Sequence, residues 1–186
     1  MLISIRRGLR PCFDFREEAS RDISSSLAAL HRLNRVTGVP GFVARTLAAP
    51  GQNITTTHWG WNDSPTMEGY RFVGNTSSDE LTGHLAAYPL ALLLAPSALS
   101  ARQAQLCTEL LTNITLRIIR DGFKVIDVDG APTRWGNYAP ASLNDDPAWQ
   151  EERGVNSVQI LAHLLLTHRI TGTSSFGNAL ALFWLL

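Results

Sequence analysis

The sequence predicts an all-α protein, made mainly of helical hairpins, with one small β-hairpin around residues 123–135. Four segments repeat apolar residues every three to four positions, as one face of a helix does. A short link joins two of these segments, and short links favour antiparallel neighbours. The 186 residues, 45% of them hydrophobic, suffice for one core of ordinary size. We therefore expect a single domain over residues 20–186.

The composition argues against several classes of partner. Lys and Arg together number 16 and Asp and Glu number 16, so there is no basic surplus for binding nucleic acid or an acidic membrane. No apolar run approaches the length of about 18 residues that indicates a membrane span. The two cysteines are too few for a disulfide framework and lack metal-site spacing. We predict no cofactor, no metal, no nucleic-acid partner and no membrane partner.

The sequence does not identify the cellular compartment of the protein. The first residues place apolar side chains before the arginines, which is the wrong order for a signal peptide. Four Asn-x-Ser/Thr sequons, the acceptor sites of N-glycosylation, weakly favour a secreted protein. They lie at Asn53, Asn62, Asn75 and Asn113.

The N-terminal half should contain two helices separated by a long connection. Residues 1–19 show no period and are expected to be a poorly ordered lead-in. A first helix is predicted over 22–37, ended by Gly38. Residues 39–76 then read as a long connection without regular structure, which is typical of functional loops. A second helix, apolar on most sides and therefore buried, should run from Ser77 to about Leu94, with Ser77 and Glu80 forming a capping box.

The C-terminal half repeats the pattern. A third, amphipathic helix is predicted from Ser100, followed by a β-hairpin that turns at Asp129-Gly130. A second polar stretch covers 137–154, and a fourth helix begins at Asn156. The apolar segment 176–186 has nothing left in the chain to bury it, so we expect a domain that is truncated at its C-terminus. Buried helices alternating with half-exposed ones suggest two layers, with the polar connections at one end.

Three motifs lie in these polar connections. They read Gly-Asn-Thr-Ser-Ser-Asp-Glu at 74–80, Ile-Asp-Val-Asp-Gly at 126–130 with Pro-Thr-Arg-Trp-Gly at 132–136, and Glu-Arg-Gly at 152–154 before Asn156. Together they resemble an uncharacterised family that is similar to the α/α-toroid, or six-hairpin, glycosidase-like proteins. The resemblance implies a partial α/α toroid, whose partner would be the missing remainder of the ring. It also implies a carbohydrate ligand.

Glycoside hydrolysis requires two carboxyl groups on either side of the bond that breaks. The candidate catalytic residues all lie in the polar connections or at the start of a buried helix. Some have structural alternatives, because Glu80 could serve only as a cap and Asp129 only as a turn residue. These candidates are Asp79, Glu80, Asp129 and Glu152.

Substrate-binding candidates are aromatic, cationic or amide side chains in the same connections. Sugar faces stack on aromatic rings, and arginine presents a planar fork to carboxylates. The tryptophans could instead seal a loop onto the core, and a histidine on a buried helix is often a core residue. Arg134 could equally form a structural ion pair. The candidates are His58, Trp59, Trp61, His84, Arg134, Trp135 and Asn156.

The sequence thus predicts a carbohydrate-active domain, glycoside hydrolase-like, with paired carboxylates at the rim of a helical toroid. Two alternatives remain open. One is a non-catalytic glycan-binding or scaffold domain, and the other is an inactive fragment of a longer protein. Whether the chain is an enzyme is not decided by the sequence.

Overall fold

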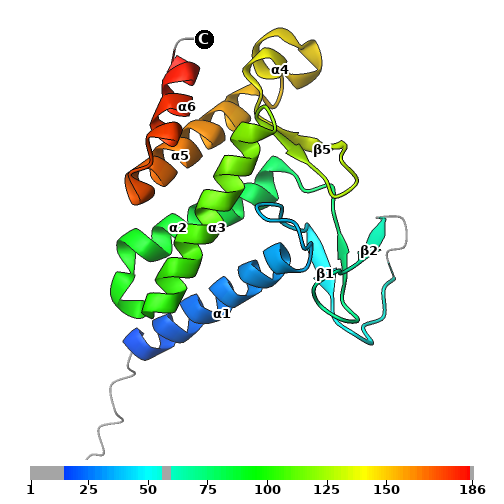
Figure 1. The fold of residues 1–186 in the computed structure, drawn as a ribbon, viewed down its shortest axis with the longest axis vertical. Helices are drawn as coiled ribbons and strands as arrows, with labels where there is room; N and C mark the ends of the chain where they lie inside the picture. Colours follow the sequence, from blue (N-terminus) through cyan, green and yellow to red (C-terminus); the bar gives the residue numbers. More distant parts are fainter. Residues whose placement is uncertain (1–14, 56–59, 185–186) are drawn as a thin grey trace, which may run out of the picture.

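The computed structural model describes residues 15–55 and 60–184, and it is mainly helical (Figure 1). Helices account for 59% of it, which confirms the predicted helical character. Two short 3-10 turns, η2 (Pro96–Ala98) and η3 (Pro147–Trp149), join helices. The α-helices of the described ranges are α1 (Phe15–Arg35), α2 (Ser78–Leu94), α3 (Ala101–Arg120), α4 (Pro140–Asp145), α5 (Arg153–Thr171) and α6 (Ser174–Trp184).

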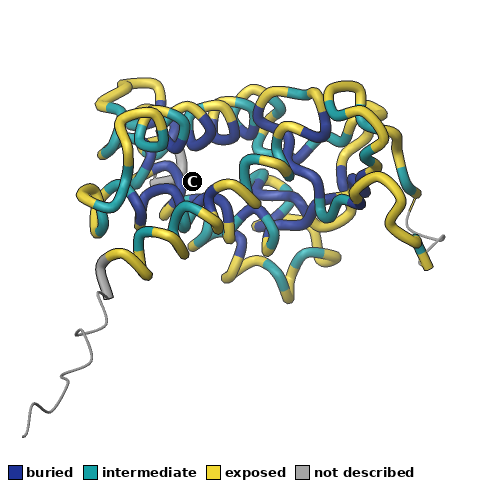
Figure 2. Tube along the Cα trace, turned by 90° about the horizontal axis from the view of Figure 1, so that it is seen from below, coloured by how far each residue is buried: buried dark blue, intermediate teal, exposed yellow. Residues whose placement is uncertain are grey.

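The helical core is built around α2. Helices α2 and α3 pack against each other, α5 packs on both, and α1 contacts both from another side. Leu81, Leu85 and Tyr88 of α2 are almost completely buried. Figure 2 shows the buried segments on the inside of the molecule and the exposed ones on the outside. This burial explains why the α2 sequence is apolar on most of its circumference.

The predicted capping box at the start of α2 is confirmed, and α3 begins with a capping box of the same kind. At the start of α2, the Ser77 backbone N–H donates to Glu80 Oε2 at 2.6 Å. At the start of α3, the Gln103 backbone N–H donates to Ser100 Oγ at 3.3 Å. Pro89 lies inside α2, and the helix nevertheless continues to Leu94. The boundaries of α2 and α3 therefore follow the sequence signals closely.

The prediction of a structureless connection over residues 39–76 is wrong. This segment contains three short strands, β1 (Thr46–Ala48), β2 (Trp61–Asp63) and β3 (Arg71–Val73), in an antiparallel sheet ordered β1-β3-β2. Phe72 of the central strand is buried with Val36 and Ala44 in a small second core. Each strand has three residues, so the alternation that identifies a strand in a sequence has no length in which to appear.

The predicted β-hairpin is confirmed as β4 (Lys124–Ile126) paired antiparallel with β5 (Pro132–Asn137). Two helix starts differ from the prediction. Helix α1 begins at Phe15, so residues 15–19 are helical instead of part of an irregular lead-in. Helix α5 begins at Arg153, which places Asn156 inside the helix and not at its cap. The residue before α5 is Glu152, whose side chain makes no cap hydrogen bond, so the local signal pointed to the later Asn156.

The apolar segment near the C-terminus has a partner, contrary to prediction. It forms α6, which packs on α5, and Phe176 and Ala179 are buried there. The short turn at Gly172, in the left-handed conformation, lets α6 fold back along α5 (Figure 1). Across the described residues, no helix is both long enough and apolar enough to span a membrane.

Two histidines lie in the helical core. His84 of α2 and His163 of α5 are 2% and 3% exposed. His84 Nδ1 lies 3.0 Å from the Tyr88 hydroxyl, and the His163 ring meets Tyr138 edge-on at 6.3 Å between ring centroids. Burial lowers the pKa of each imidazole from 6.5 to about 4. Both rings are therefore neutral at pH 7.

This arrangement predicts acid sensitivity between pH 6.5 and 4. In that window the unfolded chain takes up a proton at each histidine while the folded chain does not, so the free energy of unfolding falls as pH falls. A pKa lowered from 6.5 to about 4 corresponds to a loss of about 3 kcal/mol in the free energy of unfolding per histidine. This loss is absent above pH 6.5 and complete below about pH 4. Urea unfolding at several pH values should show this slope. His163→Gln should flatten it by about half.

Candidate functional site

The loop that leads into α2 is locked to the β4–β5 hairpin. A Cβ atom on Gly74 would lie 2.2 Å from Asp127 Oδ1, so only glycine allows this approach. On the next residue, the Asn75 backbone N–H donates to Asp127 Oδ2 at 2.5 Å. A backbone donor to an ionised carboxylate is among the stronger hydrogen bonds in proteins. Asp127 therefore clamps the chain directly before the helix.

Asn75 completes the connection from the other side. It adopts a positive φ of 49°, a conformation that asparagine tolerates better than most residues. Its Oδ1 accepts a hydrogen bond from the Arg134 backbone N–H at 2.8 Å. We call the set Gly74, Asn75, Asp127 and the Arg134 backbone the junction. It joins the first two of the three sequence motifs, which lie more than 50 residues apart.

The third motif reaches the same region through α5. Asn156 is fully buried, and its Nδ2 donates to the Asn137 carbonyl at the end of β5 at 3.0 Å. Arg153 Nε donates to the Leu143 carbonyl of α4 at 2.5 Å. From β5 onward, the buried Tyr138 hydroxyl donates to the Ser78 carbonyl at 3.4 Å. The start of α5 and the start of α2 are therefore both fixed to the end of β5.

A polar cavity of about 340 Å³ opens over the start of α2. Its walls come from four separate parts of the chain: the residue before β1, the first turn of α2, β5 and the residue before α5. Three of the four predicted catalytic carboxylates and one predicted tryptophan lie together here. The lining residues are Arg45, Ser77, Ser78, Asp79, Glu80, Trp135 and Glu152.

One carboxylate of this polar cavity is already engaged. Glu80 Oε2 accepts from the Ser77 backbone N–H, and the Ser77 hydroxyl also contacts it. Glu80 Oε1 lies 3.2 Å from Arg45 Nε in an ion pair. Glu80 thus acts as helix cap and ion-pair partner, the structural alternative considered for it.

Arg45 is the functional candidate that sequence reasoning missed. It lies in the connection that was read as irregular, with no motif around it. The strand pairing brings it into place, because the Arg45 backbone N–H donates to the Val73 carbonyl, one residue before Gly74. Only knowledge of the β1–β3 register would have placed this guanidinium beside the first turn of α2.

The other two carboxylates of the polar cavity are uncommitted. Within the part of the chain that the structure describes, neither the Asp79 nor the Glu152 side chain has a hydrogen-bond or ion-pair partner. Asp79 is exposed in the first turn of α2, where the helix dipole favours an anion. Its charge adds to the effect of burial in raising the pKa of Tyr138. One guanidinium against three carboxylates leaves the cavity acidic overall.

An aromatic surface borders the polar cavity. Trp135 is 42% exposed, although it is a large aromatic residue. The Arg134 guanidinium lies over its ring, 4.7 Å from the centroid, and the edge of Trp149 meets it at 6.5 Å between centroids. Arg134 therefore pairs with an aromatic face. Among the described residues it forms no ion pair, the alternative considered for it, and Asp127 accepts instead from the Asn75 and Val128 backbone N–H groups.

Asp129 and Trp61 lie outside this site. Asp129 is exposed, and its Oδ1 accepts from the Ala131 backbone N–H at 2.9 Å, which is the turn role considered for it. It lines a separate cavity of about 290 Å³. Trp61 is in β2, with the Arg71 guanidinium 5.9 Å from its ring centroid. The predicted catalytic set therefore divides, with Asp129 apart from the other three.

The remaining predicted binding residues are also apart from the polar cavity. His84 is in the core against Tyr88, and Asn156 is buried against Asn137. His58 and Trp59 lie outside the described residues. In the described ranges, no three His, Cys, Asp or Glu residues are grouped as a metal site requires.

No known protein family, curated protein or solved structure is significantly similar to this chain. The polar cavity is therefore the feature from which a function can be inferred. Its observable features are two uncommitted carboxylates, a half-exposed tryptophan and an overall acidic character.

The junction predicts opposite effects for two glycine substitutions. Gly74→Ala should lower the free energy of unfolding by about 1–3 kcal/mol, because the added Cβ would overlap the Asp127 carboxylate. Gly83→Ala, inside α2 with open space around its Cβ position, should raise it by about 0.5–1 kcal/mol. Chemical denaturation of both variants measures the two values. Equal effects would mean that the close approach at Gly74 does not exist.

Proposed function

We propose that this chain forms a carbohydrate-active domain, part of an α/α toroid, whose ligand site is the polar cavity at the start of α2. The observation that carries the proposal is the convergence of Asp79 and Glu152, two uncommitted carboxylates, beside the half-exposed ring of Trp135. Sugars present hydroxyl donors to carboxylates and apolar C–H faces to aromatic rings. The cavity offers partners for both.

The arrangement of the helices supports the toroid part of the proposal. Helices α2 and α3 form one hairpin and α5 and α6 another, and α5 packs against α2 and α3 (Figure 1). The N-termini of α2 and α5 lie on the same side as the two small sheets (Figure 1). Polar connections gathered at one end of buried helices suit a ring of hairpins with its site at that rim.

In a hydrolase, the two carboxyl groups would have distinct tasks. One donates a proton to the glycosidic oxygen as the bond to the leaving sugar breaks. The other, as a carboxylate, either activates a water molecule or attacks the anomeric carbon. Because Glu80 is held by Ser77 and Arg45, Asp79 and Glu152 are the pair we assign to these tasks.

The charge of the site limits the ligand class. Three carboxylates against the single guanidinium of Arg45 repel acidic sugars, so we favour a neutral oligosaccharide over a uronate. Trp135 and the side chains packed on it would hold a sugar ring beside the carboxylates.

A non-catalytic glycan-binding domain is the second candidate. It is favoured by the exposed aromatic surface of Trp135, braced by Arg134 and Trp149, because such a surface binds sugar without any carboxylate chemistry. The two candidates share a ligand class and differ only in the need for Asp79 and Glu152.

Isosteric variants distinguish these candidates. Asp79→Asn and Glu152→Gln should each lower hydrolysis of a neutral oligosaccharide by at least about 100-fold, as loss of an acid or base does, while binding persists. Glu151→Gln is the matched control, since Glu151 is adjacent in sequence but does not line the polar cavity. Reducing-sugar release and titration calorimetry on a panel of neutral and uronate oligosaccharides supply the two measurements.

Trp135→Ala should weaken binding by about tenfold under either candidate, because it removes the stacking face. Trp61→Phe, in the separate β1-β3-β2 sheet, should leave binding unchanged. Binding without turnover in the native protein would select the glycan-binding domain. Failure to bind any sugar of the panel would overturn the proposal as a whole.

A further inference from the structure

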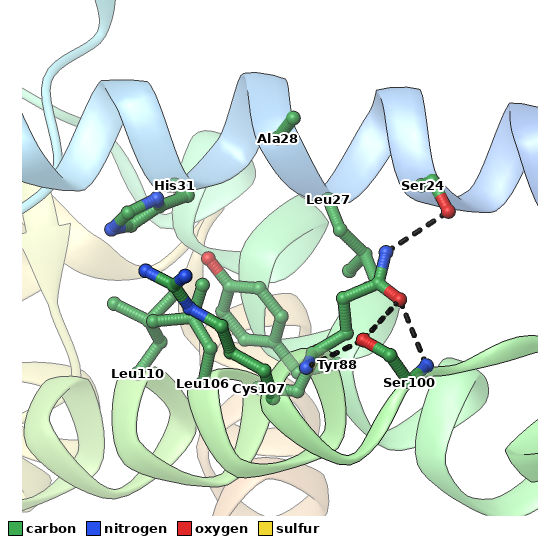
Figure 3. Close-up of a pocket in the computed structure, with 11 residues that line it drawn as sticks. Ser24, Leu27, Ala28, His31, Tyr88, Ser100, Leu106, Cys107 and Leu110 are labelled. Carbon is green, nitrogen blue, oxygen red and sulfur yellow. Dashed lines mark hydrogen bonds between the residues drawn. The ribbon is translucent and has the colours of Figure 1, made fainter.

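A second cavity, of about 260 Å³, lies between α1, α2 and α3 and shares no residue with the polar cavity. We call it the interhelical cavity (Figure 3). Leu27 comes from α1, Leu106 and Leu110 from α3, and the fully buried Tyr88 of α2 forms its floor. Burial raises the pKa of the Cys107 thiol, so this side chain is neutral and behaves as a small apolar group. The body of the cavity is therefore apolar.

One end of the interhelical cavity is fixed by a hydrogen bond between α3 and α1. Gln103 Nε2 of α3 donates to Ser24 Oγ of α1 at 2.9 Å, and Gln103 Oε1 accepts from the Ser100 backbone N–H at 2.9 Å. The dashed lines that reach Ser24 and Ser100 in Figure 3 mark these bonds. The Gln103–Ser24 bond ties α1 to α3 at this end, and the Ser100 bond within the α3 cap holds the Gln103 amide in place for it.

Most polar side chains around this cavity already have partners. Ser24, Ser100 and Gln103 bond one another, and the Tyr88 hydroxyl pairs with His84 Nδ1. Two lining side chains differ. In the described part of the chain, neither the His31 imidazole nor the Arg102 guanidinium has a hydrogen-bond or ion-pair partner.

The charge near these two side chains is positive. No Asp or Glu lines the interhelical cavity. Partial burial, together with the charges of Arg35 and Arg102, lowers the pKa of His31. Burial disfavours any charge, but the positive charges of Arg35 and Arg102, which disfavour an added proton on His31, favour an anion at the same place. The available hydrogen-bonding capacity and the field thus both fit a negatively charged group.

We propose that the interhelical cavity binds a small amphiphilic carboxylate, with the carboxylate on Arg102 and His31 and the apolar body between Leu27, Leu106 and Leu110 over Tyr88. The planar guanidinium fork matches a carboxylate, and a neutral imidazole N–H can donate to it. A volume of 260 Å³ equals that of about nine water molecules at roughly 30 Å³ each. A ligand of about ten non-hydrogen atoms therefore fits.

Octanoate and its neutral counterpart 1-octanol are suitable probes. They share the apolar body and differ at the head group, so comparing them isolates the role of the charge. Titration calorimetry on the full chain should give octanoate a Kd at least about tenfold below that of octanol. Shifted backbone amide signals of Ala28, His31 and Leu106 in NMR spectra should locate both ligands in the cavity.

Three variants test the assignment. Arg102→Gln should weaken octanoate binding by about tenfold and leave octanol binding within about twofold. Arg32→Gln, at an exposed arginine on α1 that does not line the cavity, is the matched control and should change neither. Ala28→Phe places a ring in the cavity from an exposed position on α1, so it should abolish binding of both ligands while the fold is kept.

Several results would overturn the proposal. Octanoate binding no tighter than octanol would remove the anion site. Equal losses in Arg102→Gln and Arg32→Gln would indicate attraction by net charge alone. Unchanged octanoate affinity in a folded Ala28→Phe protein would place the ligand elsewhere. None of these results depends on whether the polar cavity binds sugar.

Discussion

The hydrogen bond from the Asn75 backbone to the Asp127 carboxylate is the interaction on which the rest of the site depends. It crosses 52 positions of sequence and requires a glycine at position 74, where any side chain would meet the carboxylate. Asn75 then holds the other strand of the hairpin through the Arg134 backbone. As a result, the first turn of α2 is fixed relative to β5, and the carboxylates on that turn line the same polar cavity as Trp135. A charge-assisted bond of this type contributes about 1.5–3 kcal/mol.

The carboxylates of the polar cavity are of two kinds, one that supports the fold and two that have no partner. Glu80 is used to cap α2 and to hold Arg45, so it stabilises the turn that carries its neighbour. Asp79 and Glu152 take no part in that support, and their side chains remain available to a ligand. The buried histidines have a corresponding structural role, because they pack against Tyr88 and Tyr138 in the core beneath the site. In the first turn of α2, a structural carboxylate, Glu80, is thus the direct neighbour of an uncommitted one, Asp79.

The sequence predicted those parts of the fold that have strong local signals. The capping boxes at Ser77 and Ser100 located α2 and α3, and the Asp129-Gly130 turn located the β4–β5 hairpin. The β1-β3-β2 sheet escaped notice because three-residue strands carry too little alternation, and Arg45 was missed with it, since its position depends on long-range pairing. For the site, Asp79, Glu80, Glu152 and Trp135, which the sequence placed near one another, line a single cavity. Asp129, His84 and Asn156 did not join it, because a turn residue and buried residues share sequence patterns with ligand-binding ones.

The central claim is that the junction and the first turn of α2 form one cooperative unit. Residue-resolved hydrogen exchange by NMR, on the native chain and on Asp127→Ala, tests it most directly. The amides of Asn75, Ser77 and Arg134 should lose protection together in the variant, while amides within α1 keep theirs. The three amides donate to different acceptors, but the Asn75–Asp127 bond fixes the loop that presents Asn75 Oδ1 to Arg134 and leads into the Ser77 cap. Loss of protection at Asn75 alone, with Ser77 and Arg134 unchanged, would contradict the claim and show that the polar cavity is held by other contacts.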